Sequence, residues 1–435
     1  MKSFIVTDVR RKDVFPNLNY RFARLEESED KVILERDFLG ENPEHYYVDG
    51  KNNELIVGSN IADIREYLQN GNRNFAWDRV RAVSNNTRGI IDNSTFKTSI
   101  PLEQELGDTL QEQPLDATVD YSNFASIGKR VRTLLEDSLT QRLDSVQDQR
   151  VGLLLSGGLD SMSIGYLISR IPPLTTAFTL KVSDTDKDIL KRREMAQRCG
   201  LDLVEIGILP MGDSVRISNQ HYDSNRNLIG QRTISETSLD RIVNESLTIS
   251  GNPKKDNLLC AVAMYLAGSA IKEEGISTVF CGEGPNEMIN DYGYNPQQLG
   301  YGTSDKGDSA FREALTFGLK KSDKQLGRGG LPKHAIARMG KIFAHYGLRL
   351  EAPYFDRRIA KILTHVPHNP SYDTVKQHLM LEILSDNGFN DLIEGTSKEK
   401  FQDGSGISGI FEDYDQRKLV DMFEKTYGIR KTAYL

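Results

Sequence analysis

The sequence has little of what marks a secreted, membrane-spanning or nucleic-acid-binding protein. Its three cysteines are spread over 435 residues, an odd set that predicts reduced thiols rather than a disulfide framework. The longest apolar run, 258–267, is too short to cross a bilayer, and the first residues show no secretory segment. The net charge of −7 disfavours a nucleic-acid surface, which is usually basic. We therefore expect a cytoplasmic protein that binds neither membrane nor nucleic acid.

The most informative stretch is 151–161, an apolar run that ends in Ser-Gly-Gly and continues into a helix-like segment. Glycines let the backbone approach an anion because they carry no Cβ. The N–H groups of the turn and of the first helical turn then point at that anion. Ser156 and Ser161 add hydroxyl donors, whereas Asp160 would repel a bare phosphate and suits one that carries Mg²⁺. The pattern predicts a binding loop for a metal-bound phosphate.

A second apolar run, 277–280, ends in a similar glycine-rich turn with two acids, Cys281-Gly-Glu-Gly-Pro-Asn-Glu287. Carboxylates beside a phosphate loop suit metal ligation or proton abstraction, although such a turn alone is often only a solvated loop. Strand and helix alternate between the two turns, which predicts a doubly wound parallel sheet of the α/β class. Ligands bind such sheets at the carboxyl ends of the strands, where both turns fall. The alternating segments are strands 175–182 and 201–209 and helices 186–199 and 258–274.

Two domains are predicted from the change of pattern along the chain. Residues 1–115 form a small, mostly β domain, with Asp-Gly at 49–50 as a hairpin signal. A polar linker at 106–116 leads to an α/β domain over 121–435, which begins with an amphipathic helix from Asn123 to Leu143. From 303 onward the pattern is mostly helical. The strand-like runs of the first domain are 4–7, 31–34, 45–48 and 54–57.

The loop at 156–161 resembles the pyrophosphate loop of the N-type ATP pyrophosphatases, and it lacks the Gly-Lys-Ser/Thr of a Walker loop. Three later segments follow, in order, the synthetase domain of asparagine and β-lactam synthetases. Asparagine synthetases have Ser-Gly-Glu-Gly-x-Asp-Glu at the position of 281–287, Leu-Glu-x-Arg-x-Pro-Phe-Leu-Asp at 348–356 and Lys-Glu-x-Phe-x-Asp-Gly-x-Gly at 398–406. The resemblance implies an ATP pyrophosphatase-like fold with a helical C-terminal part. It also implies ATP and Mg²⁺ as cofactors, and a carboxylate that is adenylated before ammonia or an amine attacks it.

The resemblance also implies roles for individual residues. Glu283 is the expected base for the amine, Lys398 the expected cation at the reacting phosphate, and Lys400 its support. Asp160, Asn286 and Glu287 are the expected metal ligands, although the family has an acid where this chain has Asn286. Either Glu287 compensates for that neutral side chain or the handling of metal and pyrophosphate is altered. The residues expected to bind ATP or its pyrophosphate are Leu155, Ser156, Gly157, Gly158, Asp160, Ser161, Leu180, Cys281, Gly282 and Arg338.

Two further expectations rest on departures from the family pattern. Residues 36–61 resemble the second half of a class II glutaminase domain, of the Ntn-hydrolase type, whose nucleophile is an N-terminal cysteine. Residue 2 here is Lys and no cysteine precedes Cys199, so we expect a degenerate domain without glutaminase activity that packs on the synthetase domain. Arg349 and Glu351 carry the family's charges in exchanged positions, which implies a retained structural ion pair.

Three functions stay open at this point. The first is an amide ligase that joins a small-molecule carboxylate to external ammonia or amine. The second is an intramolecular cyclase of natural-product biosynthesis, like β-lactam or carbapenam synthetases, which have a tyrosine where this chain has Glu283. Those enzymes also carry a glutamate on the helix where this chain has Ala337, Arg338 and Lys341. The third is a decayed nucleotide-binding homologue. Related enzymes often form dimers, so a homodimer is a further expectation.

Overall fold

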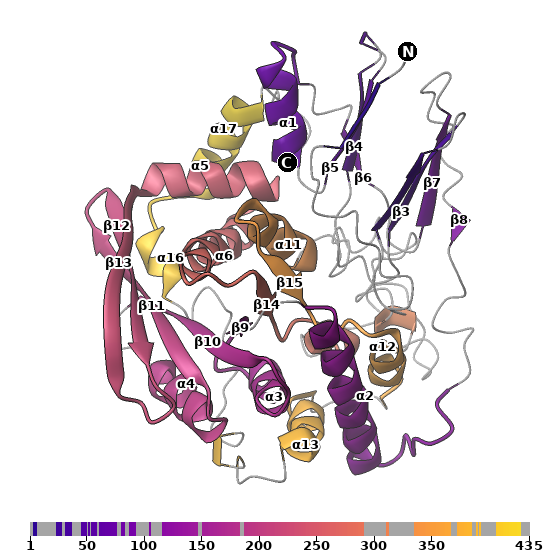
Figure 1. The fold of residues 1–435 in the computed structure, drawn as a ribbon, viewed down its shortest axis with the longest axis vertical. Helices are drawn as coiled ribbons and strands as arrows, with labels where there is room; N and C mark the ends of the chain where they lie inside the picture. The colour runs from indigo at the N-terminus through magenta and orange to yellow at the C-terminus, as the bar shows by residue number, and fades with distance from the viewer. Residues whose placement is uncertain are drawn as a thin grey trace.

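The fold is taken from a computed structural model, which describes the parts of the chain that form the large sheet, its helices and two smaller sheets (Figure 1). The described residues are 3–6, 23–27, 31–36, 45–49, 51–52, 54–58, 61–75, 80–82, 87–92, 104–105, 115–146, 150–182, 187–290, 310–312, 335–366, 372–384, 389, 391–392 and 406–427.

A seven-stranded sheet forms the centre of the larger unit, in the order β13-β12-β11-β10-β9-β14-β15. Strands β11, β10, β9, β14 and β15 are neighbours in this sheet and pair parallel, which confirms the predicted α/β class. The central strands are covered on both faces: Val151, Leu153, Ala177 and Phe178 are at most 1% exposed. The parallel strands are β9 (Arg150–Leu154), β10 (Leu174–Lys181), β11 (Asp202–Met211), β14 (Thr278–Phe280) and β15 (Arg349–Glu351).

An antiparallel hairpin extends this sheet beyond the predicted strands. It consists of β12 (Ser214–Tyr222) and β13 (Leu228–Ser238), and β12 pairs antiparallel with β11. Val215, Ile217 and Asn219 are buried at alternate positions of β12. The Asn219 amide donates to the Ala270 carbonyl of α6 (Lys255–Glu273) at 3.2 Å. The hairpin was not predicted, because polar residues separate the few apolar positions of this segment.

Helices cover both faces of the large sheet (Figure 1). On one face, α3 (Leu159–Ile168) contacts β9, and α4 (Lys187–Arg198) contacts β10 and β11. On the other face, α6 contacts β10 and β12. Helices α5 (Leu239–Ser250) and α11 (Ala335–His345) pack on α6, while α2 (Phe124–Asp144) and α13 (Tyr372–Leu384) pack on α3. The remaining described helices of this unit are α7 (Pro285–Met288), α12 (Arg357–Thr364), α16 (Ile407–Ile410) and α17 (Gln416–Tyr427).

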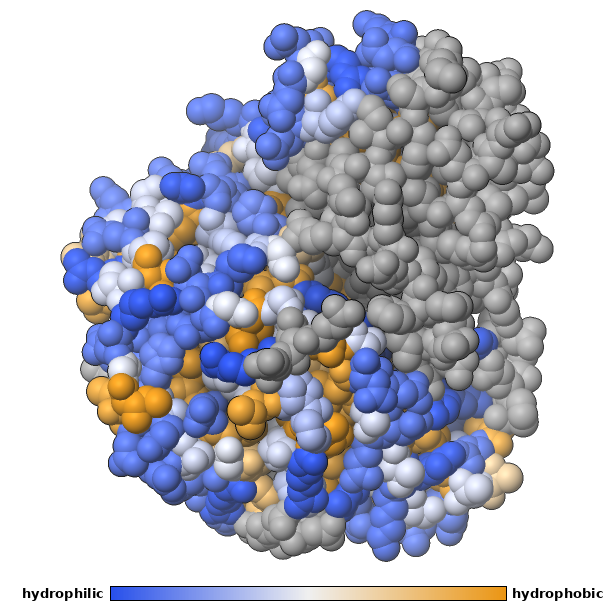
Figure 2. All heavy atoms as spheres, in the orientation of Figure 1, coloured by the Kyte–Doolittle hydropathy of each residue, from blue (hydrophilic) through white to orange (hydrophobic). Residues whose placement is uncertain are grey.

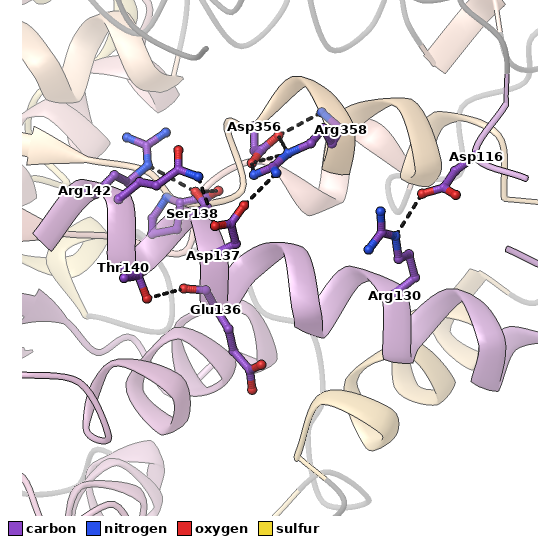
Figure 3. Close-up of polar contacts among 11 residues, drawn as sticks. Asp116, Arg130, Glu136, Asp137, Ser138, Thr140, Arg142, Asp356 and Arg358 are labelled. Atoms are coloured by element: carbon purple, nitrogen blue, oxygen red, sulfur yellow. Dashed lines mark hydrogen bonds and ion pairs between the residues drawn. The ribbon is translucent and has the colours of Figure 1, made fainter. Parts of the chain in front are cut away.

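Polar side chains fasten α2 to the start of α12 (Figure 3). The Arg358 guanidinium pairs with Asp137 of α2 at 2.6 Å. Asp356 caps α12 by accepting the Arg358 backbone N–H at 2.8 Å, and its carboxylate also pairs with the Arg358 side chain. Near the other end of α2, Arg130 pairs with Asp116 at 2.8 Å. The contacts of Arg358 and Asp356 hold the segment before α12 in a defined position, and that segment supports the candidate site.

A buried ion pair lies deeper in the same contact. Arg142 of α2 donates to the Glu351 carboxylate at 2.7 Å and to the Phe355 carbonyl at 2.9 Å. Arg142 and Glu351 are almost completely buried, at 1% and 0% exposure. Arg349, which is partly exposed, pairs with the other Glu351 oxygen at 2.5 Å. The Arg349–Glu351 ion pair expected from the exchanged charges is therefore confirmed, and Arg142 is a third member that the sequence analysis did not include.

The N-terminal part forms two four-stranded sheets, in the orders β1-β5-β4-β6 and β2-β3-β7-β8. Strands β4 and β5 pair antiparallel around the predicted Asp-Gly hairpin. Helix α1 (Ile61–Asn70) and the residues after it reach α17 through Arg65 and Phe75, which both contact the Tyr427 ring. The strands are β1 (Ser3–Val6), β2 (Ala23–Glu27), β3 (Lys31–Arg36), β4 (His45–Asp49), β5 (Glu54–Gly58), β6 (Val80–Ala82), β7 (Thr87–Asp92) and β8 (Gln104–Glu105).

Hydrophilic residues cover most of the described surface on the face drawn in Figure 2, and the hydrophobic residues among them form small groups. Hydrophobic residues scattered in this way are normal for a protein surface. No helix in the described part of the chain is long and apolar enough to cross a membrane.

Candidate active site

The first loop connects β9 to α3 and has the strand, glycine turn and helix that the sequence predicts. Gly157 has a φ of 84°, a left-handed conformation that favours glycine. The hydroxyl oxygens of Ser156 and Ser161 lie 3.0 Å apart, and Ser161 donates to the Gly158 carbonyl at 3.0 Å. The Ser156 hydroxyl in turn accepts the Gly158 N–H at 3.3 Å. These bonds hold a tight turn at the N-terminus of α3, where backbone N–H groups favour an anion.

Arg192 of α4 holds this loop from outside. Its Nε donates to the Ser156 carbonyl at 3.1 Å, and its Nη1 donates to the Leu180 carbonyl at 2.8 Å. The side chain is buried, and a Cβ added at Gly157 would lie 3.1 Å from the Arg192 Cγ. Arg192 therefore ties the loop after β9 to the end of β10. It was not among the predicted residues, since an arginine in a charged helix carries no local signal of such a role.

The second loop, from Cys281 to Gly284, follows β14 and contacts the first loop directly. Strand β14 pairs parallel with β9, so both loops leave the same edge of the sheet. A Cβ added at Gly282 would lie 2.6 Å from both the Asp160 carbonyl carbon and the Ser161 nitrogen. Only glycine permits this approach, because the neighbouring Asp160 and Ser161 atoms belong to the backbone and cannot move without shifting α3. The two turns singled out in the sequence are therefore in backbone contact.

The segment before α12 supports both loops. Gly284 has a φ of 126°, and a Cβ there would lie 3.1 Å from the Phe355 ring and 3.2 Å from the Tyr354 Cβ. The Tyr354 hydroxyl lies 2.6 Å from the Ser163 hydroxyl of α3. Burial raises the pKa of Tyr354 well above its usual range, so the hydroxyl stays protonated. Tyr354 and Phe355 thus connect the second loop to the helix that follows the first.

Lys376 of α13 places its ammonium between the two loops. Its Nζ lies 2.7 Å from the Asp160 Oδ2 of α3 and 2.5 Å from the Asn286 Oδ1 of α7. The side chains of Lys376 and Asp160 are only 12% and 14% exposed. Lys376 was not among the predicted residues, because it is separated from Asp160 by 216 positions and belongs to none of the motifs described above.

Glu283 belongs to the second loop and is half-buried. Burial raises the pKa of Glu283 above its ordinary value. The positive charge of Arg338 lowers it, the negative charge of Asp160 raises it, and Lys376 lowers it again. Arg338 comes from α11, where its guanidinium donates to the Asn257 side chain at 3.0 Å. The arrangement places a carboxyl group with a raised pKa beside the predicted phosphate loop, which suits proton transfer.

Comparison with known proteins supports the family that the motifs indicate. Residues 130–213 match the asparagine synthase family model, a span that includes the first loop and Arg192. Asparagine synthetase (glutamine-hydrolyzing) from Rattus norvegicus is 23% identical over 321 residues, 67% of this chain and 47% of that protein. The Bos taurus protein of the same name is 24% identical over 345 residues, 72% of this chain and 51% of that protein.

This chain is similar to asparagine synthetases. It spans about half the length of the curated relatives that it matches.

The chain brings most of its predicted site residues to one edge of the sheet. Leu155 is buried, and its N–H donates to the Phe178 carbonyl at 2.8 Å. Cys281 is buried, and its N–H donates to the Glu351 carbonyl at 2.8 Å. Glu287 is buried in α7. Lys398 and Lys400 lie outside the described residues, so their place in this site stays a prediction.

The predicted magnesium ligands, Asp160, Asn286 and Glu287, also stay a prediction, but as they lie they do not fit a resident ion. Magnesium requires several oxygen ligands in octahedral geometry and usually takes them from carboxylates, water and substrate phosphates. Asp160 and Asn286 instead direct one oxygen each at the Lys376 ammonium. Within the described ranges, no group of three or more His, Cys, Asp or Glu side chains could hold a metal ion.

Proposed function

We propose that this chain is an ATP-dependent, AMP-forming ligase that makes a carbon–nitrogen amide bond. A small-molecule carboxylate would be adenylated first, and ammonia or an amine would then take the acyl group. The observation that carries the proposal is the backbone contact between Gly282 and the first loop. Because of that contact, a carboxyl group suited to proton transfer, Glu283, lies next to a loop suited to pyrophosphate.

The first step would form a bond between a carboxylate oxygen of the substrate and the α-phosphorus of ATP. The bond from that phosphorus to the β-phosphate oxygen breaks, and pyrophosphate leaves from the loop between Ser156 and Ser161. In the family, Lys398 is the cation expected to stabilise the charge that develops there.

The second step would form the amide bond and release AMP. An ammonium ion or protonated amine cannot attack, so its proton must pass to a base before nitrogen bonds to the acyl carbon. The raised pKa of Glu283 makes its carboxylate a stronger base than an ordinary glutamate. Retention of this carboxyl group supports an external nitrogen nucleophile over the intramolecular cyclase. Helix α11 supports the same choice, because its sequence contains no acid and offers Arg338 and Lys341 instead.

We further propose that ammonia or an amine is taken directly rather than released from glutamine. The first cysteine of the sequence is Cys199. Burial raises the pKa of its thiol to about 12, so it is not a nucleophile at neutral pH. Incubation of the purified chain with glutamine should release no glutamate above a buffer blank. Release of glutamate at a rate comparable with amide formation would contradict this part of the proposal.

The test of adenylation is exchange of radiolabelled pyrophosphate into ATP, with a panel of amino and carboxylic acids and with no amine present. Exchange that depends on one acid would establish adenylation and name the first substrate. Lys398→Ala should abolish it, whereas Lys425→Ala, at an exposed position on α17, should leave it unchanged.

Glu283→Gln separates the two steps. It should retain exchange and lower amide formation by about 100-fold or more, since it removes the base for the amine. ATP binding without exchange for any acid, together with no amide product from the same panel with ammonia, would refute the ligase and favour the decayed homologue.

A further inference from the structure

The Lys376 ammonium occupies the position between the two loops. The Lys376 Nζ is within 2.7 Å of an oxygen from α3 and an oxygen from α7, so the two oxygens converge on one position. Oxygen ligands from separate elements surround a bound metal cation in the same way. Here the cation comes from a third element, α13, which packs on α3.

The single charge of the Lys376 ammonium matches that of its two oxygen ligands. Asp160 contributes one negative charge and Asn286 none, so a single positive charge neutralises the pair. A divalent ion between the same two side chains would leave an excess positive charge in a place where Lys376 and Asp160 are mostly buried. Two carboxylates facing the point would instead favour a divalent ion. An asparagine at 286 and a lysine at 376 are therefore mutually consistent.

The effect of Lys376 extends to Glu283. Asp160 disfavours ionisation of Glu283, and Lys376 favours it. A cation in the position of the Lys376 ammonium, whether a metal ion or the ammonium itself, thus offsets the effect of Asp160 on the pKa of Glu283.

We propose that Lys376 is a tethered cation that takes the place of a divalent metal ion between Asp160 and Asn286 when no nucleotide is bound. The amide oxygen of Asn286 and the carboxylate of Asp160 serve as its two ligands. The proposal does not depend on the proposed ligase function, because it concerns the nucleotide-free site. It makes Lys376 a positioning residue that joins α13 to both loops.

The test is a titration of the nucleotide-free protein with Mn²⁺ alone, followed by electron paramagnetic resonance of the free ion. The wild-type chain should show no saturable Mn²⁺ site that depends on Asp160, so Asp160→Asn should not change its Mn²⁺ binding. Lys376→Met combined with Asn286→Asp removes the ammonium and adds a second carboxylate. This double variant should bind one Mn²⁺ at least about tenfold more tightly than the wild type, because the net charge at the point falls by two. Lys425→Met on α17 serves as the matched control and should behave as the wild type.

Two results would overturn the proposal. One is a saturable Mn²⁺ site in the wild type that Asp160→Asn abolishes, since the metal would then bind despite Lys376. The other is a folded double variant, by circular dichroism, that binds Mn²⁺ no better than the wild type. If the double variant does not fold, Lys376→Met alone takes its place and should still bind Mn²⁺ more tightly than the Lys425→Met control. The readout is metal binding, so failure here leaves the pyrophosphate-exchange result unaffected.

Discussion

The buried ion pair between Arg142 and Glu351 yields a prediction about stability whose size follows from its surroundings. Glu351→Gln removes the negative charge but leaves the Arg142 guanidinium almost fully buried. Arg142 also donates to the Phe355 carbonyl and the Ser138 hydroxyl, which are neutral groups and do not replace the charge of Glu351. Removing one member of such a buried pair costs about 3–5 kcal/mol. We expect Glu351→Gln to lower the free energy of unfolding by that amount.

Three further variants test whether the charge pair is the cause. Arg142→Met should cost less, about 1.5–3 kcal/mol, since Glu351 still pairs with Arg349. Arg349→Met, at a partly exposed side chain, should cost about 1 kcal/mol or less. The double variant Arg142→Met/Glu351→Leu should be less destabilised than Glu351→Gln alone, because it leaves no buried charge.

Urea unfolding followed by far-ultraviolet circular dichroism measures these differences, taken from the transition midpoints with a common slope. The expected order of destabilisation is Glu351→Gln, then Arg142→Met, then Arg349→Met. If the stability losses of Glu351→Gln and Arg349→Met differed by less than about 1 kcal/mol, surface ion pairs alone could account for the difference. That result would refute a dominant role of the buried pair. A double variant as unstable as Glu351→Gln would refute it as well.

Three other substitutions have defined outcomes. Gly282→Ala should lower stability by about 1–3 kcal/mol and weaken ATP binding in calorimetry, since its Cβ would press on the Asp160 backbone. Gly230→Ala, which meets nothing within 4 Å, is the control, and equal behaviour of the two would contradict the loop contact. Glu283 has a raised pKa in the folded state, so its contribution to stability falls as pH rises from 4.5 through that raised pKa. In urea unfolding, the stability of Glu283→Gln relative to the wild type should therefore increase as pH rises over this range. A stability difference that does not change with pH would count against this prediction. Burial lowers the pKa of His365 from 6.5 to about 4, so stability should be lost as pH falls through that window, and His365→Gln should flatten this slope. An unchanged slope in that variant would show that other groups cause the acid dependence.

Much of the fold could be predicted because its signals are local. The apolar strand, the glycine turn and the helix start at 151–161 are neighbours in sequence, and each constrains the next. The helix from Asn123 was also predictable, since a capping residue precedes an amphipathic pattern, and Asn123 does accept N–H groups at the start of α2. The hairpin of β12 and β13 could not be predicted, because polar residues interrupt its apolar alternation and the burial of β12 depends on contacts with α6.

The predicted and observed sites differ in the residues that reach them from a distance. Arg192 and Lys376 each sit on a helix with no motif, and each acts on a loop that is contributed by another part of the chain. Arg142 likewise joins Glu351 across 209 positions. Such contacts depend on how helices pack on the sheet, which periodicity along one segment does not specify.

The sequence by itself determined which side chains the two turns carry, since their glycines, hydroxyls and acids are set residue by residue. It also determined the parallel α/β class, through the alternation of apolar strands with helices, and the resemblance to asparagine synthetases, through motifs in a fixed order. Only the tertiary structure decided that Gly282 lies against the Asp160 backbone and that an ammonium occupies the point between Asp160 and Asn286. The physical reason is that both features arise where separate elements meet, at distances of a few ångströms that no local pattern encodes.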